Sequence, residues 1–205
     1  MLVTICRLYD SYADASRVIL ALEVGVPPSE TSMISNDADN AHTTETANAA
    51  PVRKDAANSQ ASGKFEGAVI GAAIGATAAT AGSLITLLAI PGVGAVVGVG
   101  WLAALTGGMA AGGVTGGLLG ALTNAGISEQ DAQVLAEGVR RGGTLVAARV
   151  PQADVPRIEA VMNPSAVELQ ERSDNYHKSG WQSFDPNAVP YTADQLRGER
   201  ALHAH

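Results

Sequence analysis

Few residues in this sequence could carry chemistry. Cys6 is the only cysteine, which excludes an intramolecular disulfide or a cysteine-rich metal site. It lies in an apolar run, where a small buried thiol is the usual role. His42 is expected in a solvated loop, and His203 and His205 in a solvated tail. No set of nucleophile, base and orienting group can be recognised, so we expect no enzymatic reaction, no metal and no cofactor.

One glycine-rich run partly matches a nucleotide-binding motif. Gly98-Val-Gly100-Trp-Leu-Ala103 resembles a dinucleotide fingerprint, which also requires a preceding strand and an acidic residue about 20 positions later. No carboxylate lies between Glu66 and Glu129, and no lysine is present there for a phosphate loop. The sequence therefore argues against nucleotide binding.

The distribution of charge is uneven. The 205 residues carry a net charge of −7 without a basic run, which argues against a nucleic-acid partner. Residues 67–128 contain no Asp, Glu, Lys, Arg or His, and they hold 16 of the 23 glycines. All the charge lies outside this block, which therefore dominates any account of the architecture.

The segments on either side of the uncharged block are predicted to form helices and strands. We expect strands at 2–8 and 31–35, with a helix between them that begins after Ser11. A helix from Ser128 to Arg140-Arg141 follows the block, and the arginines suit its C-terminal end, although contact with lipid phosphate is an alternative. A strand at 144–150, a helix at 151–162 and a last strand at 166–171 complete this part.

The two ends repeat one unit. Arg7 and Arg149 fall near the ends of equivalent strands, and Asp14 and Arg17 match Asp154 and Arg157 in the helices that follow. Two β-α-β halves predict an α+β fold of the ferredoxin-like split type, with a four-stranded antiparallel sheet and helices on one face. The uncharged block becomes an insertion between the halves.

Small residues recur every four positions in the block, which places them along one stripe of a helix and lets another backbone approach closely. Pro91 and Gly92 stand between the two runs, so the pattern predicts a helical hairpin that turns there. The helix-packing residues are then Gly67, Gly71, Gly75, Gly108, Gly112, Gly116 and Gly120. The expected organisation is 1–36 (first half), 37–63 (flexible linker), 64–126 (hairpin), 127–172 (second half) and 173–205 (C-terminal arm).

The hairpin allows three interpretations. Its first arm, 67–90, would be roughly 36 Å long, enough for a bilayer core of about 30 Å. Its threonines, serines and glycines make the preference for lipid modest. Membrane association is favoured over a closed protein-only oligomer, and both over an intramolecular core. Flanking arginines and lysines place the charged domains in the cytosol.

The tail gathers aromatic residues among polar and turn residues, a pattern that suits an arm anchored ring by ring. We predict that Trp181, Phe184 and Tyr191 contact a neighbouring subunit, with docking on the chain's own sheet as the alternative. A capping box at 192–195 predicts a short helix.

Together these segments resemble the bacterial heat-induced or general stress protein family with a glycine-zipper hairpin. The resemblance rests on the first β-α-β unit, the turn Ala89-Ile90-Pro91-Gly92-Val93-Gly94, the segments 125–132 and 137–143, and the tail motifs at 184–186 and 190–194. It implies a stress-associated role without an established reaction. The long linker departs from the family pattern.

The expected function is that of a non-enzymatic, self-assembling protein whose hairpins form a homo-oligomer in or against a membrane. It would lie at the cytoplasmic face of the inner membrane, with lipid as a second partner, or in the cytoplasm as a large assembly. One alternative is a ligand-sensing module with a pocket between a sheet edge and helices. A pore is the other, disfavoured because no ionisable residue marks a conduction path.

Overall fold

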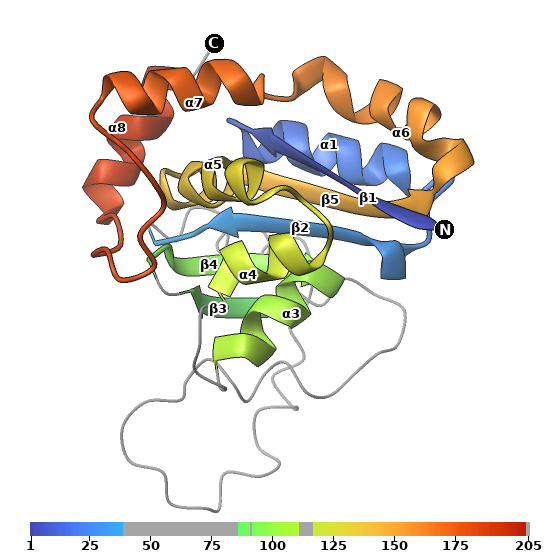
Figure 1. The fold of residues 1–205 in the computed structure, drawn as a ribbon, viewed down its shortest axis with the longest axis horizontal. Coiled ribbons are helices and arrows are strands. Elements are labelled where there is room, and N and C mark those ends of the chain that lie inside the picture. The colour runs from blue at the N-terminus through green and yellow to red at the C-terminus, as the bar shows by residue number, and fades with distance from the viewer. Residues whose placement is uncertain (39–85, 91, 111–116, 204–205) are drawn as a thin grey trace, which may run out of the picture.

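The computed structural model describes residues 1–38, 86–90, 92–110 and 117–203. Its centre is one five-stranded antiparallel sheet with the order β1-β5-β2-β4-β3 (Figure 1). The strands are β1 (Leu2–Tyr9), β2 (Thr31–Asn36), β3 (Thr86–Ile90), β4 (Gly94–Gly100) and β5 (Thr144–Pro151). The helices are α1 (Tyr12–Leu22), α3 (Trp101–Ala110), α4 (Gly117–Asn124), α5 (Glu129–Arg140), α6 (Val155–Met162), α7 (Leu169–Lys178) and α8 (Ala193–His203).

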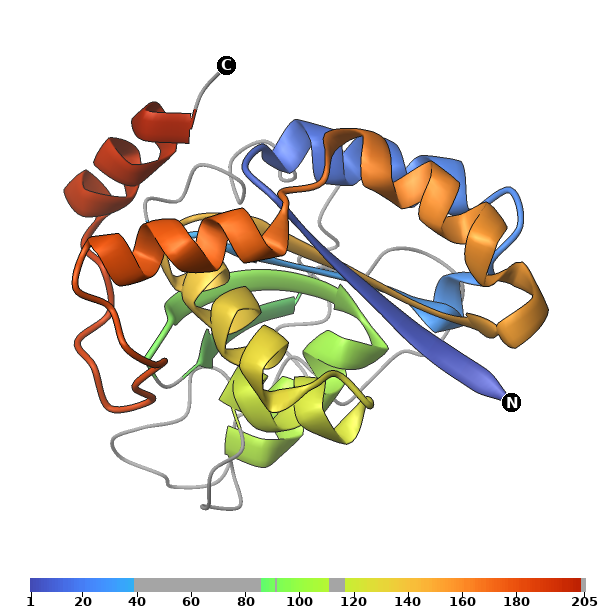
Figure 2. The ribbon, with the colours of Figure 1, turned by 45° about the horizontal axis from the view of Figure 1, so that its top comes forward.

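Helices cover both faces of the sheet (Figure 2). On one face, α1 and α6 pack over Ile5, Tyr9 and the alternate residues of β5 that point the same way. On the other face, α3, α4 and α5 cover Cys6, Leu8 and the opposite residues of β5. Successive side chains of a strand point to opposite faces, so β1 contributes to two separate cores.

Helix starts follow the predicted capping residues. The hydroxyl of Ser11 accepts a hydrogen bond from the Asp14 amide before α1, and Ser128 does the same for Asp131 before α5. Thr192 and Gln195 bond reciprocally before α8, which confirms the predicted capping box. Each contact satisfies amide groups that a helix start leaves unpaired.

The repeated unit is visible in the ion pairs. Arg17 pairs with Asp14 on α1, and Arg157 pairs with Asp154 at the start of α6. The strand arginines also behave alike, because Arg7 pairs with Glu159 and Arg149 pairs with Glu30. These exposed or half-exposed pairs contribute little to stability individually.

The prediction of a mixed α and β fold with an antiparallel sheet is correct. Two details of the prediction are wrong: the last strand, and the placement of helices on one face only. Residues 166–171 form no strand, because α7 begins at Leu169. Buried Arg172, Ser173 and Tyr176 lie three or four positions apart, a helical spacing that outweighs the strand pattern. The sheet also has helices on both faces rather than one.

The predicted helical hairpin is wrong for the described part of the block. The turn at Gly92 joins two strands, β3 and β4, which extend the sheet beyond β2. Gly94 and Gly100 have φ of +106° and +86°, values that no α-helix contains. The valines between them favour a strand, which the four-residue spacing of glycines concealed.

The described residues between 90 and 126 contribute to an intramolecular core, the least favoured of the three interpretations. Several of their apolar side chains belong to the same buried cluster as β1, β5 and α5; they include Val93, Val96, Leu102, Leu118 and Leu122. Burial in this core accounts for the lack of charge in the described part of the block. No helix in the described ranges is long and apolar enough to cross a membrane.

Candidate functional site

The outer edge of β1 borders a cleft of about 410 Å³. Its floor is Cys6, Arg7 and Leu8, and α5 contributes Leu135 from above. The far wall is the segment between α6 and α7, with Asn163 and 166–169.

The backbone of β1 leaves alternate residues facing this cleft. Leu8 is one of them, because its carbonyl accepts a hydrogen bond from the Val167 amide, 2.8 Å away and outside the sheet. Residues two apart in a strand present their amide and carbonyl groups to the same side. Leu2, Thr4 and Cys6 therefore point their backbone groups away from β5, at an edge where the described chain places no further strand.

Within the described part of the chain, the edge over residues 2–6 has no lysine, proline or bulge, and another segment bonds to the edge only at Leu8. Soluble proteins blunt edges with lysine, proline, bulges or a covering element. Residues 2–6 read Leu-Val-Thr-Ile-Cys, and the pairing of β1 with β5 runs without a bulge from Leu2 to Tyr9. Leu2 is 59% exposed. An unprotected apolar edge is a template for pairing with another strand.

The polar groups beside the cleft are already engaged. The Arg7 guanidinium donates to Glu159 at 3.0 Å, to the Asn163 side chain at 2.8 Å and to the Cys6 carbonyl at 2.9 Å. Burial raises the pKa of the Cys6 thiol to about 12, outweighing the nearby Arg7 charge. A protonated thiol is a poor nucleophile. The cleft is therefore suited to binding rather than covalent chemistry.

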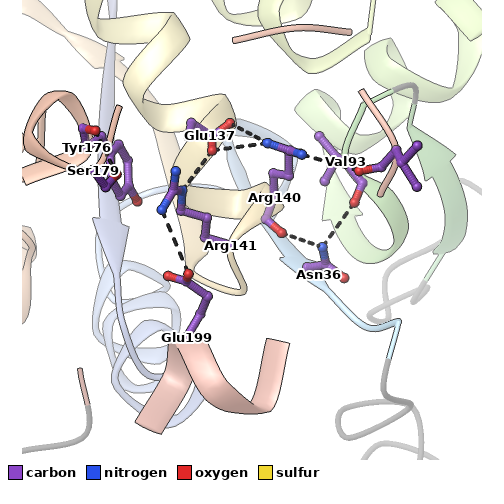
Figure 3. A network of polar contacts seen from close by, with 9 residues as sticks. Asn36, Val93, Glu137, Arg140, Arg141, Tyr176, Ser179 and Glu199 are labelled. Carbon is purple, nitrogen blue, oxygen red and sulfur yellow. Dashed lines mark hydrogen bonds and ion pairs between the residues drawn. The ribbon is translucent and has the colours of Figure 1, made fainter. Parts of the chain in front are cut away.

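A second polar cluster closes the opposite end of α5 (Figure 3). The fully buried carboxylate of Glu137 accepts hydrogen bonds from Arg140 at 3.2 Å and from Arg141 at 2.7 Å. Asn36, also fully buried, donates to the carbonyls of Val93 and Arg140, which ties β2, the β-hairpin turn and α5 together. Every charge here has a structural partner.

The same cluster holds the C-terminal arm. Arg140 donates to the Val189 carbonyl and lies 4.7 Å from the centre of the Tyr191 ring. Arg141 lies 3.8 Å from the Glu199 carboxylate of α8. Burial lowers the pKa of Arg141, but the hydrogen bond and charge of Glu137 raise it overall. The two arginines expected to cap a helix or bind lipid are thus the anchor of the arm.

The predicted arm residues all pack on their own chain. Phe184 is buried in the core that contains Val93, and the partly buried Trp181 packs against the same core. The Tyr191 ring rests on Arg140. Docking on the chain's own fold therefore describes these residues, while contact with a neighbouring subunit stays a prediction.

The structure describes two of the seven glycines predicted to pack helices, Gly108 in α3 and Gly120 in α4. The other five lie outside the described residues: Gly67, Gly71, Gly75, Gly112 and Gly116. Gly92 does lie in a turn, as predicted, but this turn joins two strands rather than two helices. Pro91, the other predicted turn residue, lies outside the described residues.

Sequence reasoning missed both of these sites. The open edge of β1 depends on the absence of a strand at 166–171, which the helical spacing after Leu169 could have signalled. Glu137 lies between the apolar positions Leu135 and Val139, and three and four residues before two arginines. That spacing places the three charged groups on one side of the helix.

Neither the family models, nor curated proteins, nor solved structures contain a match to this chain. The function must therefore be inferred from the geometry of the edge and its cleft.

Stability is expected to fall as the pH rises from about 9 towards 12. Burial raises the pKa of Tyr9 and of Tyr176 to about 12, as it does for Cys6. Because the folded values exceed those of the unfolded chain, the neutral groups stabilise the fold below pH 9 and this contribution disappears on deprotonation. Urea midpoints at pH 8, 10 and 11 measure the loss. Tyr9→Phe should give a shallower decline, whereas an unchanged slope would contradict the role of Tyr9.

Proposed function

We propose that this chain is a non-enzymatic, self-assembling protein whose assembly contact is the open edge of β1. The observation that supports it is an apolar strand edge without protecting charge, proline or bulge, beside a cleft of about 410 Å³. β-Strand addition uses such edges, with backbone hydrogen bonds supplying affinity and adjacent pockets supplying specificity.

Two further parts of the proposal come from the sequence. The stress-associated role is proposed from the family resemblance, and contact with membrane lipid from the length and composition of the predicted hairpin. Residues 67–85, which the hairpin interpretation assigned to the lipid-facing arm, lie outside the described residues. Fractionation of cells before and after heat shock would test both parts, and a fraction that never sediments with membranes would remove lipid from the proposal.

Light scattering on the purified full chain tests self-assembly directly. The expected molar mass is a multiple of 20.8 kDa, and Thr4→Pro should reduce it to the monomer mass. Proline removes the outward amide of Thr4 but leaves the hydrogen bonds to β5 in place, as edge positions tolerate. Circular dichroism should show an unchanged fold. A wild-type chain that remains monomeric at all concentrations would overturn the proposal.

A ligand-sensing module is the second candidate, because a cleft does lie between a sheet edge and helices. Its volume falls in the range of small-molecule sites. A small molecule that raised the melting temperature of the wild type, but not of a Leu135→Trp variant with a filled cleft, would favour sensing over assembly.

A further inference from the structure

We infer that two copies pair their β1 strands antiparallel about a two-fold axis, so that Leu2 of each copy enters the cleft of the other beside Cys6. This inference rests on the proposed function and names the partner and the register of that same edge. The partner's strand would lie along residues 2–6 of β1, before the point at which Val167 bonds to Leu8.

The register follows from the backbone groups available. Leu2, Thr4 and Cys6 point their amides and carbonyls outward, whereas the Leu8 carbonyl is engaged by Val167. Antiparallel strands bond through residues that both face the partner. The pairing that uses all three outward-facing residues places Thr4 opposite Thr4 of the partner subunit and Leu2 opposite Cys6 of the partner subunit. The Cys6 carbonyl already accepts a hydrogen bond from the Arg7 guanidinium at 2.9 Å, and it would accept a second one in this pairing.

The side chains are compatible with this register. Directly opposite residues of an antiparallel pair project from the same face. Cys6 and Leu8 project towards α5, and Leu2 and Thr4 share that face by alternation. Leu2 of the partner subunit would then meet Cys6, Leu135 and Leu169, which line the cleft. An exposed leucine would thus enter a cleft that is lined by both apolar and polar residues, with Arg7, Asn163 and Glu168 among the polar ones.

A second copy fits this edge because β1 is complementary to itself. The exposed apolar side chain lies at the start of β1 and the cleft lies near its end. An antiparallel two-fold axis brings the start of one strand against the end of the other, so each contact occurs twice.

Crosslinking across the axis tests the register. In a Cys6→Ala background, Thr4→Cys would place two thiols opposite each other at a Cα separation of about 5.5 Å, within the range of a disulfide. Mild oxidation should convert most of the protein to a covalent dimer. Val24→Cys in the same background is the control, because Val24 is 91% exposed and lies away from the edge.

A charged residue in place of Leu2 tests whether this side chain enters the cleft of the other copy. Leu2→Asp should weaken self-association at least tenfold by sedimentation equilibrium, whereas Leu20→Asp, at a similarly exposed position on α1, should leave it unchanged. An oligomeric wild type with no Thr4 crosslink above the control, and no effect of Leu2→Asp, would overturn this inference while the proposed function stands. A strictly monomeric wild type would overturn both.

Discussion

Replacing Glu137 with alanine is expected to lower the free energy of unfolding by about 3–5 kcal/mol, because it removes the counter-ion of the largely buried Arg140 and leaves Arg141 with only Glu199, 3.8 Å away. The Glu137 side chain is fully buried, while those of Arg140 and Arg141 are each 16% exposed. Removing one partner of a buried ion pair costs far more than the pair itself contributes. Urea denaturation followed by tryptophan fluorescence measures the change.

The matched control is Arg17→Ala, which breaks an ion pair whose arginine is 72% exposed on α1. Its effect should stay below about 1 kcal/mol. Glu137→Gln should fall between the two, since the amide keeps the shape and an acceptor but not the charge. A loss for Glu137→Ala no larger than the control would show that Glu137 does not hold this end of the molecule.

Among the described glycines, Gly100 is the one at which substitution by alanine is expected to destabilise the fold most. A Cβ at this position would lie 2.1 Å from the Thr31 carbonyl oxygen and 2.8 Å from the Ser32 Cα, and the φ of +86° is itself unfavourable for alanine. The strained conformation alone costs about 1–3 kcal/mol. The clash adds to it because the neighbouring atoms are backbone, so the variant should lose β2–β4 pairing or fail to fold.

Substitutions at two other glycines allow the cost of backbone strain to be measured apart from the cost of a steric clash. Gly126 has a φ of +92° with open space around it, so Gly126→Ala should cost only about 1–2 kcal/mol. Gly198 lies within α8 with nothing nearby, and Gly198→Ala should stabilise by about 0.5–1 kcal/mol. Thermal unfolding of the three variants should rank them in this order, and an equal effect at 100 and 126 would contradict the predicted collision.

Local signals were read correctly where capping and periodicity agreed. The strands β1, β2 and β5 and the helices α1, α5 and α6 lie where the sequence predicts them, with Ser11 and Ser128 at the expected helix starts. The pairing of Asp14 with Arg17 and of Asp154 with Arg157 matches the internal repeat. Neighbouring residues determine these features, so one sequence suffices to find them.

The glycine-rich block was misread because glycine spacing carries two meanings. A four-residue interval suits close helix packing, whereas Gly94 and Gly100, which lie outside that repeat, provide positive φ at the two ends of β4. A lack of charged residues indicates that a segment is buried, but it does not distinguish burial in a lipid bilayer or an oligomer from burial in the chain's own core. The candidate site was missed for a related reason, since an open edge depends on which strands pair, and pairing joins residues far apart in sequence.

The contact between the turn at Gly92 and the C-terminal arm has a consequence for how the chain is made. A Cβ at Gly92 would lie 2.6 Å from the Asp185 carbonyl oxygen, and Phe184 belongs to the core formed by Val93 and Val96. Synthesis delivers the uncharged block long before the arm that covers it. The nascent chain therefore carries an incompletely covered apolar surface until Phe184 and the residues around it have also left the ribosome, and the domain can close only after the arm has been made.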